Sequence, residues 1–468
     1  MPESKKVGDP RLRLVPSIDQ LLRSDEAVKL QATLGLKRVT ALARSVTAEI
    51  RTAVRDGSFE AGITSESLRD KAAKRLEELA TTESRAGIRS VINATGVVLH
   101  TNLGRAPLSD AALKAINEAA RYSTLEYDTA SGLRGKRGAR AEALLCHLTG
   151  AEEALIVNNC AAAALLILAV IAGDGETLVS RGELVEIGGD FRVPDVMASS
   201  GTRMIEVGTT NKTHLDDYRK AITSKTRLIM RVHPSNYRVV GFVSSPDLSQ
   251  LVSVARDAMV PLYEDAGSGQ LSDLSNLGVE GEPVISRLIS DGADLISFSG
   301  DKLLGSIQAG LIVGKRSIVD RLRRHPLYRA LRCDKIRIAA IEATLSAHQK
   351  ASAQSDIPVL RMMALTKTEI RARAQRIISE VSNRKHGLVL ELIDGESAVG
   401  GGAGPTDNLP TALIAISHPE RSTQELETSL RSSNPPIVAR IAEQKVLLDL
   451  RTVFPDQEDL LQSALENL

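Results

Sequence analysis

The sequence predicts an α/β protein: a mostly parallel sheet with helices on both faces, preceded by a helical domain and followed by a small α+β domain. Three observations predict this architecture. The chain has 468 residues, about three times the ~150 residues of a typical domain. From about residue 150, short β-rich runs alternate with helical patterns, which is typical of a parallel sheet covered by helices. Before about residue 80, apolar side chains recur only at helical spacing.

The N-terminal domain is predicted over residues 1–80. Ser17, with Gln20 three residues later, fits a capping box at a helix start. Apolar residues then recur at helical spacing, and a third helix is predicted over Ser67–Leu79. These spaced residues are Leu36, Val39, Leu42, Ala43 and Val46. Lys and Arg slightly outnumber Asp and Glu here, so the domain is either a solvated helical unit or a docking module for a polyanion.

The large α/β domain is predicted over residues 81–337. Helical patterns such as Ala161–Ala172 and Ser245–Asp257 lie between most of its strands. The seven predicted strands are Ala154–Val157, Thr177–Ser180, Arg203–Val207, Leu228–Val232, Pro261–Glu264, Leu295–Phe298 and Leu311–Val313.

The C-terminal α+β domain is predicted over residues 338–468. A long helical stretch, from about Arg337 to Arg384, leads to strands expected at Leu388–Leu392, Ala412–Ile416 and Lys445–Asp449. The segment Ser397–Pro410 is rich in Gly and Pro, which favours a flexible loop.

Composition excludes several classes of protein. Hydrophobic residues make up 43% and charged residues 25%, which excludes a disordered or fibrous chain. The net charge of +1 gives no sign of a nucleic-acid or membrane partner, and 2% aromatics without Trp disfavour a base-stacking RNA surface. The three cysteines form no C-x-x-C pair, so no disulfide framework and no metal site is expected. The longest apolar run, Ala161–Ala172, is too short for a bilayer, and the first residues lack a secretory signal. We therefore expect a cytoplasmic protein.

Lys302 and Asp265 are the strongest candidates for chemistry. Lys302 lies in S-F-S-G-D-K-L-L-G, after one β run and before another, and Asp265 ends a neighbouring run, Y-E-D-A-G. Ligands of α/β sheets bind at the carboxyl ends of strands, so the two side chains are expected to converge. A lysine that forms an imine and an acid that keeps a pyridine nitrogen protonated are the pair that pyridoxal phosphate requires. Alone, Lys302 would be read as a surface lysine and Asp265 as a turn cap.

A phosphate site is predicted at the start of the following helix pattern. Asn159, Cys160 and Ala161 connect a strand to an Ala- and Leu-rich helix, whose first backbone N–H groups lack intrahelical acceptors and attract anions. The Ser299 hydroxyl would assist. The sequence thus contains, in order, a strand, a turn that can bind phosphate, the acid Asp265 and the lysine Lys302. This order is typical of a fold type I pyridoxal-phosphate enzyme.

Longer motifs carry a closer resemblance over nearly the whole chain. They include R-S-V-I-N-A-T-G-V-V-L-H-T-N-L-G-R-A-P-L-S (89–109), G-K-R-G-A-R (135–140), E-V-G-T-T-N-K-T-H (206–214), V-H-P-S-N-Y (232–237) and P-L-Y-R-A-L-R-C-D-K (326–335). On these motifs the chain resembles the bacterial L-seryl-tRNA(Sec) selenium transferases, or selenocysteine synthases. The resemblance implies a fold type I pyridoxal-phosphate transferase that converts L-seryl-tRNA(Sec) to L-selenocysteinyl-tRNA(Sec) with selenophosphate.

The resemblance also implies roles for individual residues. Lys302 would hold pyridoxal phosphate until the seryl amine displaces it as an external aldimine, and would then act as the base. Loss of the serine hydroxyl would leave a dehydroalanyl intermediate, to which selenium adds. Arg105, Arg329 and Arg332 lie at the family's anion-binding positions, and guanidinium groups suit the phosphate oxygens of selenophosphate. On a helix, Arg329 and Arg332 would share one face, although charge alone also fits a solvated basic helix over 321–337.

Partners and assembly come from the resemblance too. The N-terminal domain would bind seryl-tRNA(Sec). The chain would form at least a dimer, or a ring of dimers such as a decamer. G-K-R-G-A-R could contact tRNA phosphate or a neighbouring subunit's cofactor region, or be a plain surface loop. His233, at a strand end, is a weaker site candidate.

Two departures and two alternatives remain. Ser306-Ile307 stands where the family has Gly-Pro, which would reshape a turn near the cofactor, and Cys160 and Cys333 stand where Asn and Val are expected. One alternative is a pyridoxal-phosphate lyase or β-replacement enzyme acting on a free amino acid, which has no need of a tRNA-docking domain. The other is a helical RNA-binding protein with an inert α/β scaffold, which the lysine–aspartate pair and the arginines disfavour.

Overall fold

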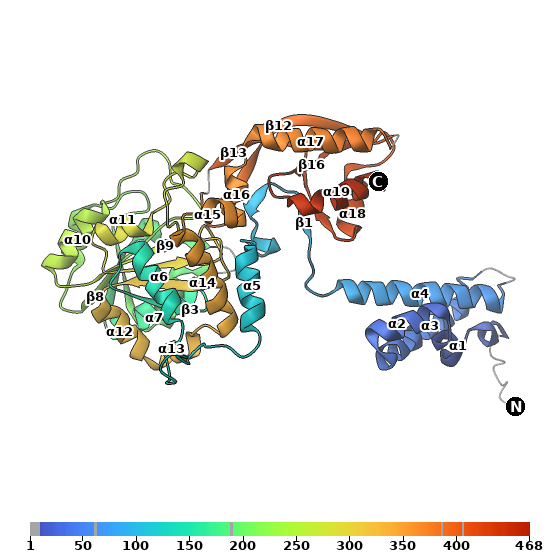
Figure 1. The fold of residues 1–468 in the computed structure, drawn as a ribbon, viewed down its shortest axis with the longest axis horizontal. Coiled ribbons are helices and arrows are strands. Elements are labelled where there is room, and N and C mark those ends of the chain that lie inside the picture. Colours follow the sequence, from blue (N-terminus) through green and yellow to red (C-terminus); the bar gives the residue numbers. More distant parts are fainter. Residues whose placement is uncertain (1–9, 60–62, 188–190, 385–386, 405–406) are drawn as a thin grey trace, which may run out of the picture. The chain divides into compact units, whose positions relative to one another are not determined.

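The chain forms two compact units, Met1–Ser90 and Val91–Leu468. A computed structural model describes residues 10–59, 63–187, 191–384, 387–404 and 407–468 (Figure 1). Residues 1–9 of the predicted N-terminal domain therefore lie outside the described residues. No described helix is both long enough and apolar enough to cross a bilayer.

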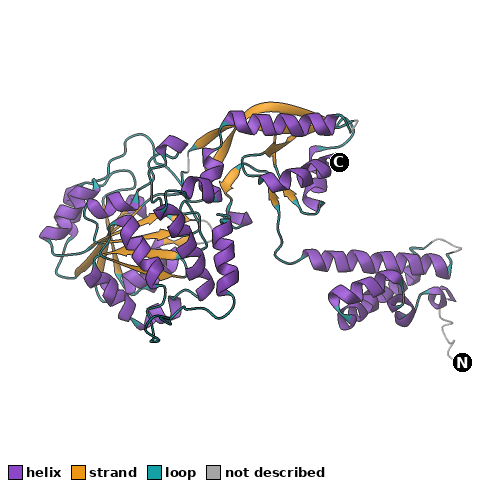
Figure 2. Ribbon diagram, in the orientation of Figure 1, coloured by secondary structure: helices purple, strands orange, loops and turns teal. Residues whose placement is uncertain are grey.

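The described residues of the first unit form helices and no strands, as Figure 2 shows. A short 3-10 turn, Pro10–Leu14, precedes α1 (Ile18–Leu22), α2 (Asp25–Leu34), α3 (Leu36–Arg55) and α4 (Ser65–Arg85). The predicted capping box is confirmed: Gln20 N–H donates to the Ser17 hydroxyl, and the Gln20 side chain accepts from Ser17 N–H. The predicted apolar stripe of α3 packs against α4, except that Leu36 at the helix start is exposed.

The second unit contains a seven-stranded sheet with the order β3-β11-β10-β9-β8-β4-β7. All seven predicted strands lie in it, with ends shifted by a few residues. β11 is antiparallel to both of its neighbours, and the other pairings are parallel. The strands are β3 (Glu153–Val157), β4 (Glu176–Ser180), β7 (Arg203–Val207), β8 (Thr226–Val232), β9 (Leu262–Gly267), β10 (Leu295–Ser299) and β11 (Gly310–Gly314).

Helices cover both faces of this sheet, as predicted (Figure 1). Ile156 and Leu155, neighbours in β3, pack into different apolar clusters because successive strand side chains point to opposite faces. One face is covered by α6 (Ala139–Thr149), α10 (Leu248–Asp257), α11 (Ile285–Ser290) and α14 (Lys335–Gln349). The other is covered by α7 (Cys160–Ala172), α8 (Val193–Ser199) and α12 (Arg316–Arg324).

A five-stranded sheet follows, with the order β15-β16-β13-β12-β2. Its strands are β2 (Val97–Leu99), β12 (Val389–Gly400), β13 (Asn408–Ser417), β15 (Arg440–Ala442) and β16 (Lys445–Asp449). β2 comes from the segment expected to open the large domain, yet it pairs in parallel with β12. Likewise β1 (Ile92–Asn93) pairs with β14 (Ile437–Val438). The boundary predicted between residues 337 and 338 stays a prediction.

The long helical stretch predicted after Arg337 is confirmed, and it is divided into several helices: α14 is followed by α15 (Ala353–Asp356), α16 (Pro358–Ala364) and α17 (Lys367–Ser382). Pro358 opens α16, because proline suits only the first helical turn. The segment Ser397–Pro410 is not a flexible loop along its length, since strands β12 and β13 pair up to Ala398 and Asn408. Residues 405–406 lie outside the described residues.

Candidate active site

The carboxyl ends of β9 and β10 bring Asp265 and Lys302 to one place. The two strands are parallel neighbours, with Ser297 of β10 paired to Asp265 of β9. Both candidate side chains are enclosed: Asp265 is 7% exposed and Lys302 is 5% exposed. Gly267, at the end of β9, has a φ of +65°, and a Cβ there would lie 4.0 Å from the Lys302 Nζ. The predicted convergence therefore occurs.

The Asp265 carboxylate accepts three hydrogen bonds at one oxygen. Gly267 N–H and the Ser297 hydroxyl each donate to Oδ1 at 3.3 Å, and the Cys160 thiol donates at 3.6 Å. Burial keeps the pKa of the Cys160 thiol far above its usual range, so the sulfur stays a protonated donor. Burial also raises the pKa of Asp265, against the opposing charge of Lys302. A further positive charge placed against this carboxyl would favour its ionised form.

The Lys302 amine is held by the backbone of a distant segment. Burial lowers the pKa of Lys302, and the Arg105 guanidinium acts in the same direction; a lowered pKa favours the neutral amine that a nucleophile or base requires. Nζ donates to the Gly402 carbonyl at 3.1 Å. Sequence analysis missed Gly402, because the surrounding G-G-A-G was interpreted as part of a flexible loop.

The turn between β3 and α7 has the features predicted for a phosphate site. Asn159 caps α7, its side chain accepting from Ala162 N–H at 2.8 Å, and Cys160 and Ala161 occupy the first helical positions. Gly310 of β11 lies so close that a Cβ there would be 2.2 Å from the Asn159 carbonyl oxygen. Ser299 is buried at the end of β10.

The three candidate arginines have different surroundings. Arg105 Nη1 bonds Asp301 Oδ2 at 2.8 Å, directly beside Lys302 in the chain. Arg332 lies next to the turn between β3 and α7 through a β-bridge to Val157. Arg329 is exposed on α13 (Pro326–Leu331).

The single basic helix over 321–337 is not formed. α12, α13 and α14 divide this run, and Arg332 has extended backbone just past the end of α13. Arg329 and Arg332 therefore do not share a helical face. His325-Pro326 separates α12 from α13, because a proline disfavours helical backbone in the residue before it.

The departure at Ser306-Ile307 is accommodated without left-handed backbone at either residue. Ser306 N–H donates to the Gly300 carbonyl at 2.8 Å, and its buried hydroxyl accepts from Thr344 at 3.0 Å. Ile307 packs against the core. Gly305, with a φ of +72°, supplies the turn directly after the lysine segment.

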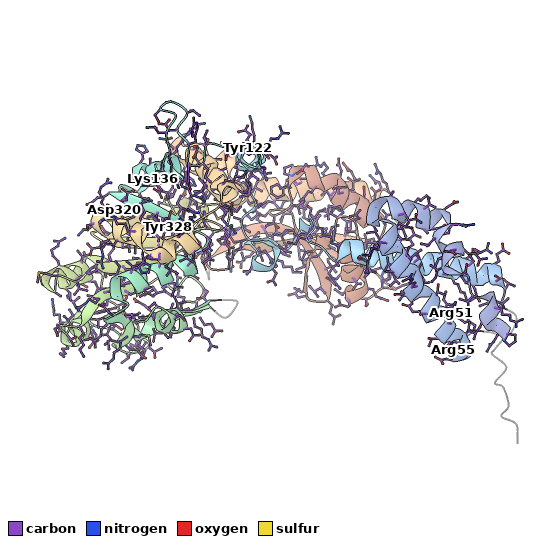
Figure 3. The ribbon with its side chains drawn as sticks, turned by 90° about the horizontal axis from the view of Figure 1, so that it is seen from below. Arg51, Arg55, Tyr122, Lys136, Asp320 and Tyr328 are labelled. Atoms are coloured by element: carbon purple, nitrogen blue, oxygen red, sulfur yellow. The ribbon has the colours of Figure 1, made fainter. Side chains whose placement is uncertain are left out.

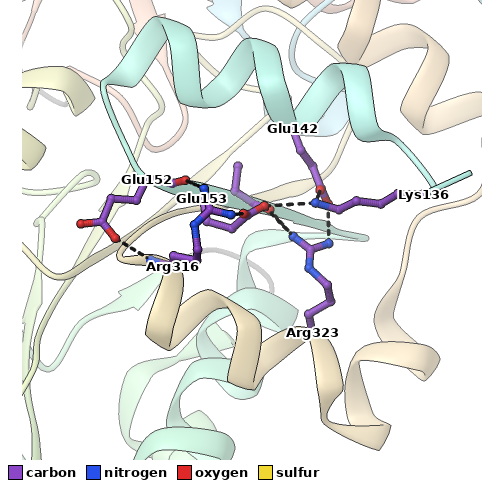
Figure 4. Close-up of polar contacts among 7 residues, drawn as sticks. Lys136, Glu142, Glu152, Glu153, Arg316 and Arg323 are labelled. Atoms are coloured by element: carbon purple, nitrogen blue, oxygen red, sulfur yellow. Dashed lines mark hydrogen bonds and ion pairs between the residues drawn. The ribbon is translucent and has the colours of Figure 1, made fainter.

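Lys136 of the G-K-R-G-A-R motif is exposed but contacts the enclosed carboxylates of Glu142 and Glu153 (Figure 4). Arg323 pairs with the same two carboxylates, and Arg316 pairs with that of Glu153. Arg137, next in the motif, donates to Glu126 and to the Cys333 carbonyl. These pairings favour a structural role for Lys136 and Arg137 over a contact with tRNA phosphate.

The residues present fit pyridoxal phosphate. Two enclosed polar atoms near the proposed position, Asn158 Oδ1 and Ser235 Oγ, have no protein hydrogen-bond partner among the described residues, and such atoms call for a ligand or water. Ser235 Oγ would lie 3.4 Å from a Cβ on Gly267, and the same Cβ would lie 4.0 Å from the Lys302 Nζ. Among the described residues, no group of three or more His, Cys, Asp or Glu is arranged to hold a metal ion.

Comparisons with known proteins identify the family. Residues 91–454 match the family described as L-seryl-tRNA selenium transferase, and residues 12–51 match the selenocysteine synthase N terminal family. An L-seryl-tRNA(Sec) selenium transferase of Geobacter sulfurreducens is 44% identical over 458 residues, 97% of this chain and 98% of that protein. One of Moorella thermoacetica is 44% identical over 459 residues, 97% of this chain and 96% of that protein.

A solved structure supports the fold. D-Glucosaminate-6-phosphate ammonia-lyase superposes with a TM-score of 0.57 over 82% of this chain and 97% of that one. At 20% identity this likeness concerns the fold alone. The predicted fold class, fold type I of the pyridoxal-phosphate enzymes, is confirmed, and pyridoxal phosphate is the cofactor. Because the family matches cover both units and the relatives align over nearly the full length, this chain belongs to the L-seryl-tRNA(Sec) selenium transferase family.

Proposed function

We propose that this protein converts L-seryl-tRNA(Sec) to L-selenocysteinyl-tRNA(Sec), with selenophosphate as the selenium donor. The observation that carries the proposal is the enclosed Lys302 amine, which lies with Asp265 at the strand ends and next in sequence to the Asp301–Arg105 ion pair. A base, an anchor for a cofactor and a cation for an anionic donor are thus in one region.

The cofactor would be held by residues already described. Lys302 would bond to its aldehyde carbon, Asp265 would face its ring nitrogen, and the α7 N-terminus with Ser299 would bind its phosphate. When bound, pyridoxal phosphate withdraws electrons from the substrate Cα and so acidifies the Cα–H bond.

Lys302 would move the proton at the serine Cα. Its lowered pKa increases the fraction of neutral amine at a given pH, and enclosure excludes water that would compete for the proton. Arg105, and with it Arg329 and Arg332, would bind the phosphate oxygens of selenophosphate, for which guanidinium groups offer paired donors. Arg105→Lys should therefore raise the KM for selenophosphate while leaving the KM for seryl-tRNA(Sec) unchanged.

The first unit would bind the tRNA. Arg51 and Arg55 are exposed on α3 (Figure 3), and such side chains recognise nucleic-acid phosphates. Binding should weaken as salt rises, because neutralised phosphates release counterions.

The free cysteines suit a reducing cytoplasm.

Assembly into at least a dimer, and into a ring of dimers such as a decamer, is part of the same proposal. Its support is the set of large apolar side chains that the second unit exposes, among them Tyr122, Leu133 and Phe242. Light scattering of the purified protein measures the mass directly.

The test follows selenium from labelled selenophosphate into aminoacyl-tRNA. Label should enter seryl-tRNA(Sec), and neither free serine nor another seryl-tRNA should replace it. The absorption band of the bound cofactor should change only with seryl-tRNA(Sec). A response to free amino acids alone would instead identify the lyase or β-replacement enzyme. A protein that takes up no pyridoxal phosphate at all contradicts both functions.

A further inference from the structure

The segment Gly400–Gly404 lies directly against the Lys302 amine. Gly402 is buried, and its carbonyl accepts from Nζ at 3.1 Å. A Cβ on Gly402 would come within 2.5 Å of Nζ and 3.0 Å of Cε, and the residue has a φ of +85°. The segment therefore contacts the lysine through backbone that only glycine can bring so close.

Two hydrogen bonds fix this segment on either side of Gly402. Gly401 N–H donates to the Leu99 carbonyl of β2 at 3.1 Å. Gly404 N–H donates to Glu282 Oε1 at 2.8 Å. The first contact is between backbone groups, so only the second depends on the chemistry of a side chain.

Glu282 is suited to hold its end of the segment. It is 8% exposed, and the same oxygen lies 3.4 Å from His233 Nε2. Burial raises the pKa of Glu282, but the His233 and Gly404 donors together outweigh burial and the pKa is lowered. An ionised, enclosed carboxylate is a strong acceptor for a backbone N–H.

His233 is in turn fixed to the strand that carries Asp265. Its N–H donates to the Asp265 carbonyl at 2.9 Å. The contacts therefore run from β9, through His233 and Glu282, to Gly404 and the segment over Lys302. The roles proposed for Lys302 and Asp265 do not account for these contacts.

We propose that Glu282 and His233 are positioning residues, which hold the Gly402 carbonyl where it orients the Lys302 amine whenever that amine is not bonded to the cofactor. An unbound lysine side chain has many rotamers, and a fixed acceptor selects one of them. One N–H then points to Gly402, which leaves the nitrogen lone pair free for the substrate proton. This inference rests on the proposed role of Lys302 as the base.

The first test measures access to Lys302 in the cofactor-free, full-length protein. A small amine-reactive reagent is applied for short times, and the modified Lys302 peptide is quantified by mass spectrometry against exposed Lys315 as the internal reference. Glu282→Ala should raise the relative rate at Lys302 by roughly ten- to hundredfold, the range for losing one hydrogen bond to a charged group. Glu282→Gln keeps an acceptor oxygen for Gly404 N–H and should stay within about threefold of the unchanged protein.

The second test uses the loaded enzyme. Glu282→Ala should lower kcat by at least about tenfold, leave the KM for seryl-tRNA(Sec) unchanged and retain the cofactor band, whereas Glu282→Gln should restore most of kcat. Gly402→Ala should lower kcat further, because the added Cβ displaces the amine. Gly241→Ala is the matched control: its φ is +105°, yet a Cβ there meets nothing within 4 Å.

Two results would overturn the proposal. One is a Glu282→Ala protein whose Lys302 labelling and kcat both stay within twofold of the unchanged protein. The other is a parallel rise in the labelling of the half-buried Lys335, Lys367 and Lys445 with loss of cofactor, which would indicate general loosening. The labelling needs no substrate, so it distinguishes failure of this inference from failure of the proposed selenium transfer.

Discussion

Two regions meet at the Lys302 amine, and they contribute by different means. The ends of β9 and β10 supply side chains, namely the Asp265 carboxylate, the Ser297 hydroxyl and the lysine itself. The segment Gly400–Gly404 supplies the backbone carbonyl of Gly402, a residue whose lack of a side chain lets it lie against the amine. The first region acts by chemical identity and the second by shape.

This difference predicts different kinds of damage. At the strand ends, a substitution of nearly equal shape removes a functional group and should impair chemistry in a folded protein. At a close-packed glycine, one methyl group keeps the chemistry but forces atoms apart. Substitutions in each region test where this division holds.

Lys302→Ala should cause the largest loss. It removes the cofactor's covalent anchor and the base together, and general base catalysis alone is worth about 10²- to 10⁴-fold. Single-turnover rates with seryl-tRNA(Sec) and the absorption spectrum measure the two losses. Lys220→Ala, at an exposed position, is the control and should change neither. Substantial activity in Lys302→Ala would remove the lysine from the mechanism.

Asp265→Asn should cost about a hundredfold or more in kcat. The amide keeps the shape and can still accept from Ser297, but it carries no charge to hold a proton on the cofactor ring. Cys160→Ala removes only one weak thiol donor to the same oxygen and should cost a few-fold at most. Comparing kcat of the two variants shows whether the charge of Asp265 or its hydrogen bonds matter more for catalysis. Equal losses in both variants would contradict a role for the charge.

Gly310→Ala tests whether added bulk alone can also impair the region at the strand ends. Its Cβ would lie 2.2 Å from the Asn159 carbonyl, so the phosphate turn must shift. Overpacking of this kind costs about 1–3 kcal/mol, which predicts a roughly ten- to hundredfold weaker cofactor affinity in a titration of cofactor-free protein. Gly87→Ala, where a Cβ meets nothing within 4 Å, is the control. Unchanged affinity in Gly310→Ala would show that the turn does not hold the phosphate.

Glu183 tests a buried carboxyl away from the lysine. Burial raises the pKa of Glu183 to about 8. The nearby Arg231 charge opposes this rise, and the nearby Glu264 charge adds to it. Between its ordinary pKa and about 8, the folded protein keeps a proton that the unfolded chain has lost, so stability falls as pH rises through this window. Glu183→Gln should reduce that fall.

Thermal unfolding at pH 5.5 and 8.5 measures this effect as the change in midpoint. The midpoint of the variant should exceed that of the unchanged protein by more at pH 8.5 than at pH 5.5, with a difference of a few degrees. Glu206→Gln, an exposed carboxyl paired with Arg181, is the control and should show no such trend. An equal gap at both pH values would mean that Glu183 is already ionised at pH 5.5.

The sequence by itself determined the local features of this protein. All seven strands of the main sheet, the Ser17 capping box and the Asn159 turn follow from spacing and residue type within a few positions, because periodicity and capping depend on near neighbours. Lys302 and Asp265 were also found this way, since parallel strands end at one edge of a sheet. The long motifs then indicated the family, and the comparisons confirmed it.

Only the tertiary structure decided which distant segments meet. The Gly402 carbonyl lies 100 residues along the chain from Lys302, and β2 joins a sheet made mostly from the far end of the sequence. Arg332 leaves its helix because it forms a bridge with Val157 instead. None of these contacts can be recognised from the residues near it in sequence. A glycine-rich segment has the same sequence whether it is exposed to solvent or packed against an amine. Packing against the rest of the fold makes that choice, since it decides which backbone groups are buried and must find partners.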